Sequence, residues 1–137
     1  MRPDCTLITS CFDLTKYHKG SRTLEDCINN MKSLLEVPCY LVIFTDNNCI
    51  NLIKEIRNSF NLDDTTHYIV CDFEKIEYYK YNDIVKSNRA INWPTKDERT
   101  CSESHILVCN KFNFVLQIIK LNPFNTTKFG WIDSSLG

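Results

Sequence analysis

The stretch Tyr40–Asp46, YLVIFTD, decides the fold, because it is the most strand-like run in the chain and it stops at a carboxylate. A short run of apolar residues with almost no charge is typical of a strand buried on both faces of a sheet. Three other runs share this character, and each also leads to an aspartate: Thr6–Phe12, His67–Cys71 and Lys128–Ile132. The four aspartates that follow the predicted strands are Asp13, Asp46, Asp72 and Asp133.

Helical patterns separate the first three predicted strands. Thr23 is a predicted N-cap, and an apolar stripe with helical spacing follows it as far as Leu35. A second helix is predicted after Asp46, with one face formed by Cys49, Ile53, Ile56 and Phe60. A short helix is expected over 73–81.

The remaining segment before the last strand has two parts. The pattern weakens over Asn82–Arg99, which we expect to be an irregular surface excursion. Ser102–Leu121 is the longest predicted helix, with an apolar face of Cys109, Phe112, Leu116 and Ile119. Strands that alternate with helices imply right-handed crossovers, so the predicted fold is α/β, with a mostly parallel sheet of about four strands and flanking helices.

Composition limits the classes of protein. A chain of 137 residues fits a single domain spanning 1–137. The formal charge of -1, with scattered lysines, argues against a nucleic-acid partner. No apolar run approaches the ~20 residues of a membrane span, and the N-terminus lacks the pattern of a signal peptide. We therefore expect a cytoplasmic protein whose eight cysteines are reduced and mostly buried.

The strand-end aspartates are the main candidate site. In a parallel sheet they share one edge, where carboxylates repel one another unless a cation or hydrogen-bond donors offset the charge. Asp46 and Asp72 have a simpler explanation as helix caps, since helices follow them directly. Asp133 is the strongest metal candidate because Ser134 and Ser135 are a weak helix start. The expected ion is Mn²⁺ or Mg²⁺, completed by substrate phosphates and water.

Other residues are candidate contacts for a nucleotide. Thr9 and Ser10, at the end of the first strand, can hydrogen-bond a base or ribose, and Asp46 lies on the same edge. Arg57 and Lys111 are candidate phosphate partners, although a lone cation on a helix is more often simply solvated. Cys101, His105 and Cys109 recur at four-residue spacing. We interpret them as core residues rather than a soft-metal site, because a zinc site normally has four ligands.

Four motifs carry a family resemblance: TLITSCFDL near the N-terminus, YLVIFTD, NKFNFVLQIIKLNPFNTTKF, and the closing FGWIDSSLG. Over Thr6–Gly137 the chain resembles the HtrL/YibB-type proteins, a family regarded as glycosyltransferase-like with a GT-A nucleotide-sugar fold. The resemblance implies a nucleotide-sugar donor, with Asp133 holding the metal against its diphosphate. It also implies that Thr9 lies near the nucleotide and that Lys111 belongs to the family pattern.

The chain departs from the GT-A pattern in two ways. GT-A enzymes commonly use Asp-x-Asp, whereas Ser135 stands at the third position here. The acceptor-binding half and the catalytic base of GT-A enzymes usually follow this motif, so the resemblance implies a donor-binding half without an obvious base. The alternative is a catalytically inactive nucleotide-sugar-binding or remnant protein. In either case we expect a homo-oligomer or a second polypeptide to complete the fold, because the sheet should leave an edge or an apolar face uncovered.

Overall fold

The computed structural model describes residues 4–18, 22–92 and 100–134. Four parallel strands form one sheet in the order β3-β2-β1-β4. The strands are β1 (Cys5–Cys11), β2 (Tyr40–Thr45), β3 (Thr66–Val70) and β4 (Lys128–Trp131). Each agrees with its predicted range to within one residue at either end, so the parallel α/β prediction is confirmed.

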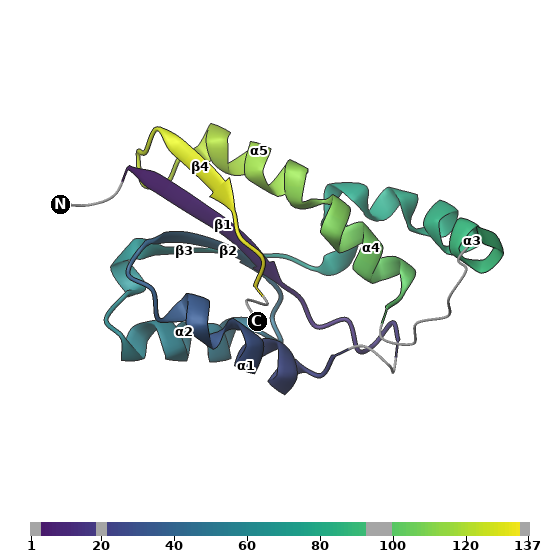
Figure 1. The fold of residues 1–137 in the computed structure, drawn as a ribbon, viewed down its shortest axis with the longest axis horizontal. Helices are drawn as coiled ribbons and strands as arrows, with labels where there is room; N and C mark the ends of the chain where they lie inside the picture. Colours follow the sequence, from purple (N-terminus) through teal and green to yellow (C-terminus); the bar gives the residue numbers. More distant parts are fainter. Residues whose placement is uncertain (1–3, 19–21, 93–99, 135–137) are drawn as a thin grey trace.

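Helices cover both faces of the sheet (Figure 1). The helices and 3₁₀ turns are α1 (Leu24–Leu35), α2 (Ile50–Ser59), η1 (Asp63–Thr65), η2 (Phe73–Lys75), η3 (Glu77–Tyr81), α3 (Asn82–Asn92), α4 (Ser102–Cys109) and α5 (Lys111–Leu121). On one face, α1 and α2 pack Met31, Leu34 and Ile53 against Leu41 and Ile43 of β2. On the other face, α5 packs Phe114 and Ile118 against Ile8 and Phe44.

Aromatic stacking joins α5 to three strand ends. The Phe114 ring lies 4.1 Å from the Phe44 ring, 6.3 Å from the Phe12 ring and 6.2 Å from the Trp131 ring, measured between centroids. Such pairs add about 0.5–1.5 kcal/mol each beyond the burial of their area. Phe114 therefore holds the first turn of α5 against the carboxyl ends of the strands.

Two predictions of local structure were wrong. Residues 82–92 form helix α3 rather than an irregular excursion, and 93–99, the rest of that segment, lie outside the described residues. The long helix predicted over Ser102–Leu121 is two helices divided at Asn110. Asn110 is buried, and its side-chain oxygen accepts a hydrogen bond from the Tyr78 amide at 2.9 Å. That contact between segments 32 residues apart is invisible to helical periodicity.

Two buried faces also differ from prediction. Phe60 is 46% exposed, so the predicted face of α2 ends before it. The face of α5 that contains Phe112, Leu116 and Ile119 points to solvent, whereas Phe114 and Ile118 are buried. The helix is apolar on both sides, and periodicity alone does not say which side meets the sheet.

Candidate functional site at the carboxyl edge

The strand order defines one switch point at the carboxyl edge. From β1 the chain moves through β2 to β3 on one side, and it then crosses to place β4 on the other side of β1. In open α/β sheets a ligand-binding crevice lies at such a reversal, beyond the carboxyl ends of the strands. The switch point here lies between β1 and β4, whose carboxyl ends run side by side in Figure 1.

Asp133 stands at this switch point. It follows the end of β4 and is exposed to solvent. The indole nitrogen of Trp131 donates a hydrogen bond of 2.9 Å to its Oδ1 atom. The Trp131 ring is stacked on Phe114 of the core. This stacking holds the indole nitrogen in place and so orients the Asp133 carboxylate.

Among the predicted site residues, Ser10 is the one that the pairing of β1 with β4 places nearest to Asp133. Ile8 pairs with Trp131, and the Ile132 amide donates to the Ile8 carbonyl at 2.9 Å. Continuing this parallel register brings Asp133 level with Ser10, two residues further along each strand. Alternation places both on the sheet face covered by α5, on which Ile8 and Trp131 lie.

Thr9 points to the opposite face and is fully buried. Its hydroxyl has no hydrogen-bond partner within the described parts of the chain. A buried hydroxyl without a partner costs about 1–3 kcal/mol by mutational measures. In this structure Thr9 contacts the core beneath the site rather than the open edge.

Asp46 joins the ends of β1 and β2. Its carboxylate accepts hydrogen bonds from three backbone amides, those of Asp13 at 2.8 Å, Asn48 at 3.1 Å and Cys49 at 3.0 Å. These bonds cap the turn that leads into α2. The N-cap of α2 itself is Cys49, which has no side-chain cap bond, so Asp46 is a turn cap rather than the predicted helix cap. Asp72 is exposed, and its side chain makes no cap bond in the described structure.

Asp13 is held in a second set of hydrogen bonds. Oδ1 accepts from the Thr15 amide at 3.0 Å and the Thr15 hydroxyl at 2.6 Å, and Oδ2 accepts from the Asn48 side chain at 3.3 Å. Partial burial pushes the pKa of Asp13 upward, but the bonds from Thr15 and Asn48 outweigh it, so the net pKa is lowered. Hydrogen-bond donors therefore offset the charge of Asp13, and the Asp46 carboxylate beside it accepts its own set of backbone amides.

Arg57 lies at the other end of the sheet. It belongs to the last turn of α2 and is fully buried. The guanidinium donates to the carbonyls of Leu35, Val37 and Cys39 and to the hydroxyls of Thr65 and Thr66, at 2.7 to 3.4 Å. These acceptors precede β2 and begin β3, so the structure does not bring Arg57 to the switch point. Burial lowers the pKa of Arg57 from its usual value.

Lys111 lies at the carboxyl end of the sheet, where the candidate site is. It opens α5, one turn before Phe114, and α5 runs antiparallel to β4. Its ammonium lies 5.4 Å from the centroid of the Phe112 ring. Lys111 is thus the one predicted phosphate partner whose element starts beside the carboxyl ends of the strands.

Sequence reasoning missed a cluster in the loop after β1. The Tyr17 hydroxyl donates to Glu74 of η2 at 2.9 Å, and burial together with this carboxylate raises the pKa of Tyr17. Glu103, in the first turn of α4, is only 2% exposed and accepts from the Ser102 hydroxyl at 2.7 Å. Lys86 of α3 lies 3.9 Å from it. The Tyr17–Glu74 and Lys86–Glu103 contacts join different segments of the chain, and no local sequence motif indicates them.

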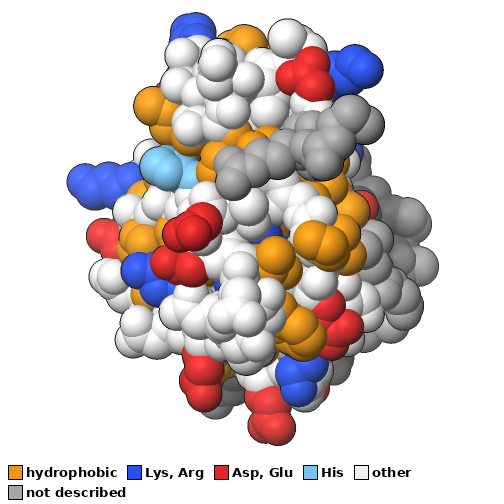
Figure 2. Space-filling view, turned by 90° about the vertical axis from the view of Figure 1, so that its left-hand side faces the viewer, with side chains coloured by type: hydrophobic (Ala, Val, Ile, Leu, Met, Phe, Trp, Pro, Cys, Tyr) orange, Lys and Arg blue, Asp and Glu red, His pale blue; other side chains and the backbone are white. Residues whose placement is uncertain are grey.

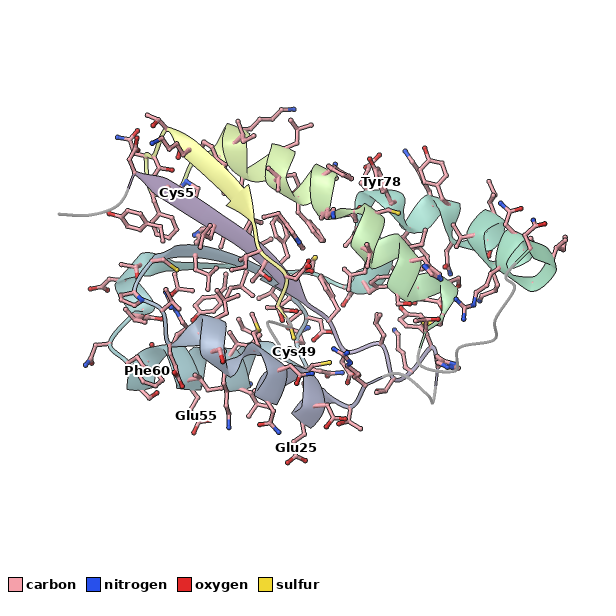
Figure 3. The ribbon with its side chains drawn as sticks, in the orientation of Figure 1. Cys5, Glu25, Cys49, Glu55, Phe60 and Tyr78 are labelled. Carbon is pink, nitrogen blue, oxygen red and sulfur yellow. The ribbon has the colours of Figure 1, made fainter. Side chains whose placement is uncertain are left out.

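The described residues limit the metal chemistry. Within 4–18, 22–92 and 100–134, no three His, Cys, Asp or Glu side chains converge as a metal-binding group. All eight cysteines are free thiols, as expected, but only Cys11, Cys49 and Cys101 are fully buried. Cys109 is exposed, so its interpretation as a core residue was wrong. Figure 3 shows Cys49 near the carboxyl ends of the strands and Cys5 at the opposite end. His105 forms a 2.7 Å hydrogen bond with Arg89.

The fold is that of an open α/β protein with an all-parallel sheet, and the Asp133 carboxylate is exposed at the switch point of this sheet. The family model described as "Bacterial protein of unknown function (HtrL_YibB)" matches residues 3–137. The chain therefore belongs to this family, as the resemblance of its motifs had indicated. No curated protein and no solved structure matches the chain. Among the helices of the described residues, none has the length and apolar character needed to cross a membrane.

Proposed function

We propose that the carboxyl edge between β1 and β4 binds the nucleoside diphosphate of a sugar donor, as the donor-binding part of a metal-dependent glycosyltransferase with a GT-A-like fold. The observation that carries the proposal is the exposed Asp133 carboxylate, oriented by Trp131 at the switch point of a parallel sheet. Parallel α/β sheets bind nucleotides at this position. The GT-A likeness of the sequence motifs supports the same class of ligand.

The donor set at this edge fits one mode of cation binding. Only one oxygen of Asp133 receives the indole hydrogen bond, and the residue is exposed. Mg²⁺ and Mn²⁺ are commonly held by one or two carboxylates, with substrate phosphates and water completing the shell. When bound here, such a cation would offset the charge of the diphosphate and help the nucleotide to leave. Asp133 would hold it, Ser10 lies level with Asp133, and Lys111 would add positive charge from the start of α5.

Donor binding without turnover is the second candidate. The carboxylates of Asp13 and Asp46 are held in internal hydrogen bonds, which fits a structural role better than that of a catalytic base. This favours a chain that holds a nucleotide sugar without catalysing its transfer. If the protein binds the nucleotide sugar but does not cleave it, with or without added acceptors, this candidate is favoured over the enzyme.

The test is thermal unfolding with UDP, GDP, CDP or their sugar conjugates, with and without Mn²⁺. A ligand that binds only the native state at 100 times its Kd stabilises by about 2.7 kcal/mol. Asp133→Asn is expected to remove the metal-dependent part of the shift. Asp72→Asn is the matched control, because Asp72 is also an exposed strand-end aspartate but lies three strands away, about 14 Å at normal strand spacing. If no nucleotide shifts the transition, or both variants behave alike, the proposal fails.

A further inference from the structure

A row of apolar side chains lies uncovered on the outer side of α4 and α5. Phe112 is 69% exposed, Leu116 52% and Ile119 46%, and Cys109 is also exposed. We call these four residues the outer stripe. Phe114 and Ile118, on the opposite side of the same helix, are 1% and 0% exposed and pack on the sheet. A helix that is apolar all round is typical of one buried on all sides.

The spacing of the outer stripe fits a helical partner. Cys109, Phe112, Leu116 and Ile119 follow intervals of three, four and three residues, which is the a/d pattern of a heptad seam. The Asn110 amide bonds to Ile106 at 2.9 Å and the Phe114 amide bonds to Asn110 at 3.0 Å, so α4 ends and α5 begins at Asn110, and Cys109 belongs to the neighbouring helix. The part of the stripe on α5, from Phe112 to Ile119, runs along about 10 Å of helix surface at 1.5 Å per residue. Val108, 62% exposed, widens it on one side.

The charge around the stripe is of one sign. The ionisable side chains of α5 are Lys111 and Lys120, and this helix carries no carboxylate. The Lys111 ammonium lies 5.4 Å from the Phe112 ring, and Lys120 occupies a position that flanks the seam. Asn113 and Gln117 lie on the same flank as Lys120, are neutral, and are joined by a hydrogen bond of 2.6 Å.

From the seam and its lysines we propose that the outer stripe is a docking site for an amphipathic α-helix of a partner protein whose apolar face is flanked by Asp and Glu. Charged residues beside a helical seam select the partner through opposite charge. A second copy fits less well, because pairing stripe to stripe brings lysines together without carboxylates from α5 to offset them. The stripe faces away from the sheet, whereas the donor edge lies at the ends of β1 and β4 (Figure 1), and Lys111 at the start of α5 is the residue that the two proposals share.

The test uses two synthetic four-heptad peptides with Leu at a and d, one with Glu and one with Lys at the flanking e and g positions. Fluorescence anisotropy with the whole chain is expected to show the Glu peptide binding at least tenfold more tightly than the Lys peptide. Phe112→Gln should weaken binding of the Glu peptide at least tenfold, since burying a Phe side chain is among the larger apolar gains. Lys120→Glu should reduce the preference for the Glu peptide.

Ile84→Gln is the matched control, because Ile84 is 60% exposed on α3 and lies outside the stripe. It should leave peptide binding unchanged. Far-UV circular dichroism and the unfolding midpoint of each variant separate lost binding from lost folding. Equal binding of both peptides, or equal losses in Phe112→Gln and Ile84→Gln, would overturn the proposal. So would self-association in sedimentation that Phe112→Gln abolishes, or binding to anionic vesicles without binding to the Glu peptide.

Discussion

The two ends of the sheet treat their polar groups in opposite ways. At the amino end, Arg57 is fully buried and directs five hydrogen bonds to carbonyls and hydroxyls around it. At the carboxyl end, Asp133 is exposed with a single indole donor, and the Thr9 hydroxyl beneath it has no partner in the described structure. The amino end satisfies a buried cation with internal acceptors, whereas the carboxyl end also holds Asp13 and Asp46 in internal bonds but leaves the Asp133 carboxylate exposed.

The surface of the amino end agrees with this contrast. Figure 2 looks onto that end, where hydrophobic side chains form small groups between acidic and basic ones. Mixed charge of this kind makes no strong field to attract a charged ligand. The difference teaches that a buried cation in an α/β protein need not mark a binding site, whereas an exposed carboxylate at a switch point is a better candidate.

Arg57→Met gives the largest expected effect. The methionine fills part of the space of the side chain but leaves the carbonyls of Leu35, Val37 and Cys39 without their donor. Several buried acceptors without partners should cost about 3–5 kcal/mol of the free energy of unfolding. Urea denaturation measures it, with Lys54→Met on the exposed surface of α2 as the control. A loss below about 1 kcal/mol would mean that the Arg57 hydrogen bonds add little stability, and the contrast between the two ends of the sheet would then fail.

Asp13→Ala comes next, with an expected loss of about 2 kcal/mol at pH 7, because Thr15 and Asn48 lose a charged acceptor. The folded pKa of Asp13 lies below its usual value of 3.8, so its stabilisation is present above that value. It is lost as the pH falls through 3.8 and then through the lower folded pKa. Denaturation curves of both proteins should therefore converge once the pH falls below the folded pKa. A difference that persists there would assign the loss to packing.

Thr9→Val has the smallest effect and the opposite sign. The valine removes a buried hydroxyl that has no partner within the described residues, so stability should rise by about 1 kcal/mol. Since Thr9 is fully buried, nucleotide binding should not change. Chemical denaturation and titration with nucleotide and Mn²⁺ check the two halves separately. Weaker nucleotide binding by Thr9→Val would mean that the hydroxyl reaches the ligand, as its position at the end of the first strand predicted.

The strands were predictable because each is a short apolar run that ends at a polar residue, and burial on both faces leaves little freedom in composition. The position of Arg57 was also accessible from sequence. A crossover helix begins at the carboxyl edge and ends at the amino edge, so a residue in its last turn lies far from the strand-end aspartates. The same rule correctly places Lys111, which opens its helix.

Other features depended on tertiary contacts. The break at Asn110 is stabilised by the Tyr78 amide, and no pattern within the helix reveals it. Thr15 and the Asn48 side chain donate hydrogen bonds to the Asp13 carboxylate, which lies beside Asp46. These bonds depend on loop geometry. The buried side of α5 was ambiguous because both sides are apolar, and the neighbouring rings of Phe44 and Trp131 decide it.

The position of β1 at the centre of the sheet has a consequence for how the protein is made. The first strand to leave the ribosome pairs with β2 on one edge and with β4 on the other, and Thr6 hydrogen-bonds Thr126, 120 residues later. Until Lys128–Trp131 emerges, the nascent sheet presents the bare edge of its own central strand. Synthesis at about 5–20 residues per second keeps that edge open for several seconds, which makes it a natural target for chaperones.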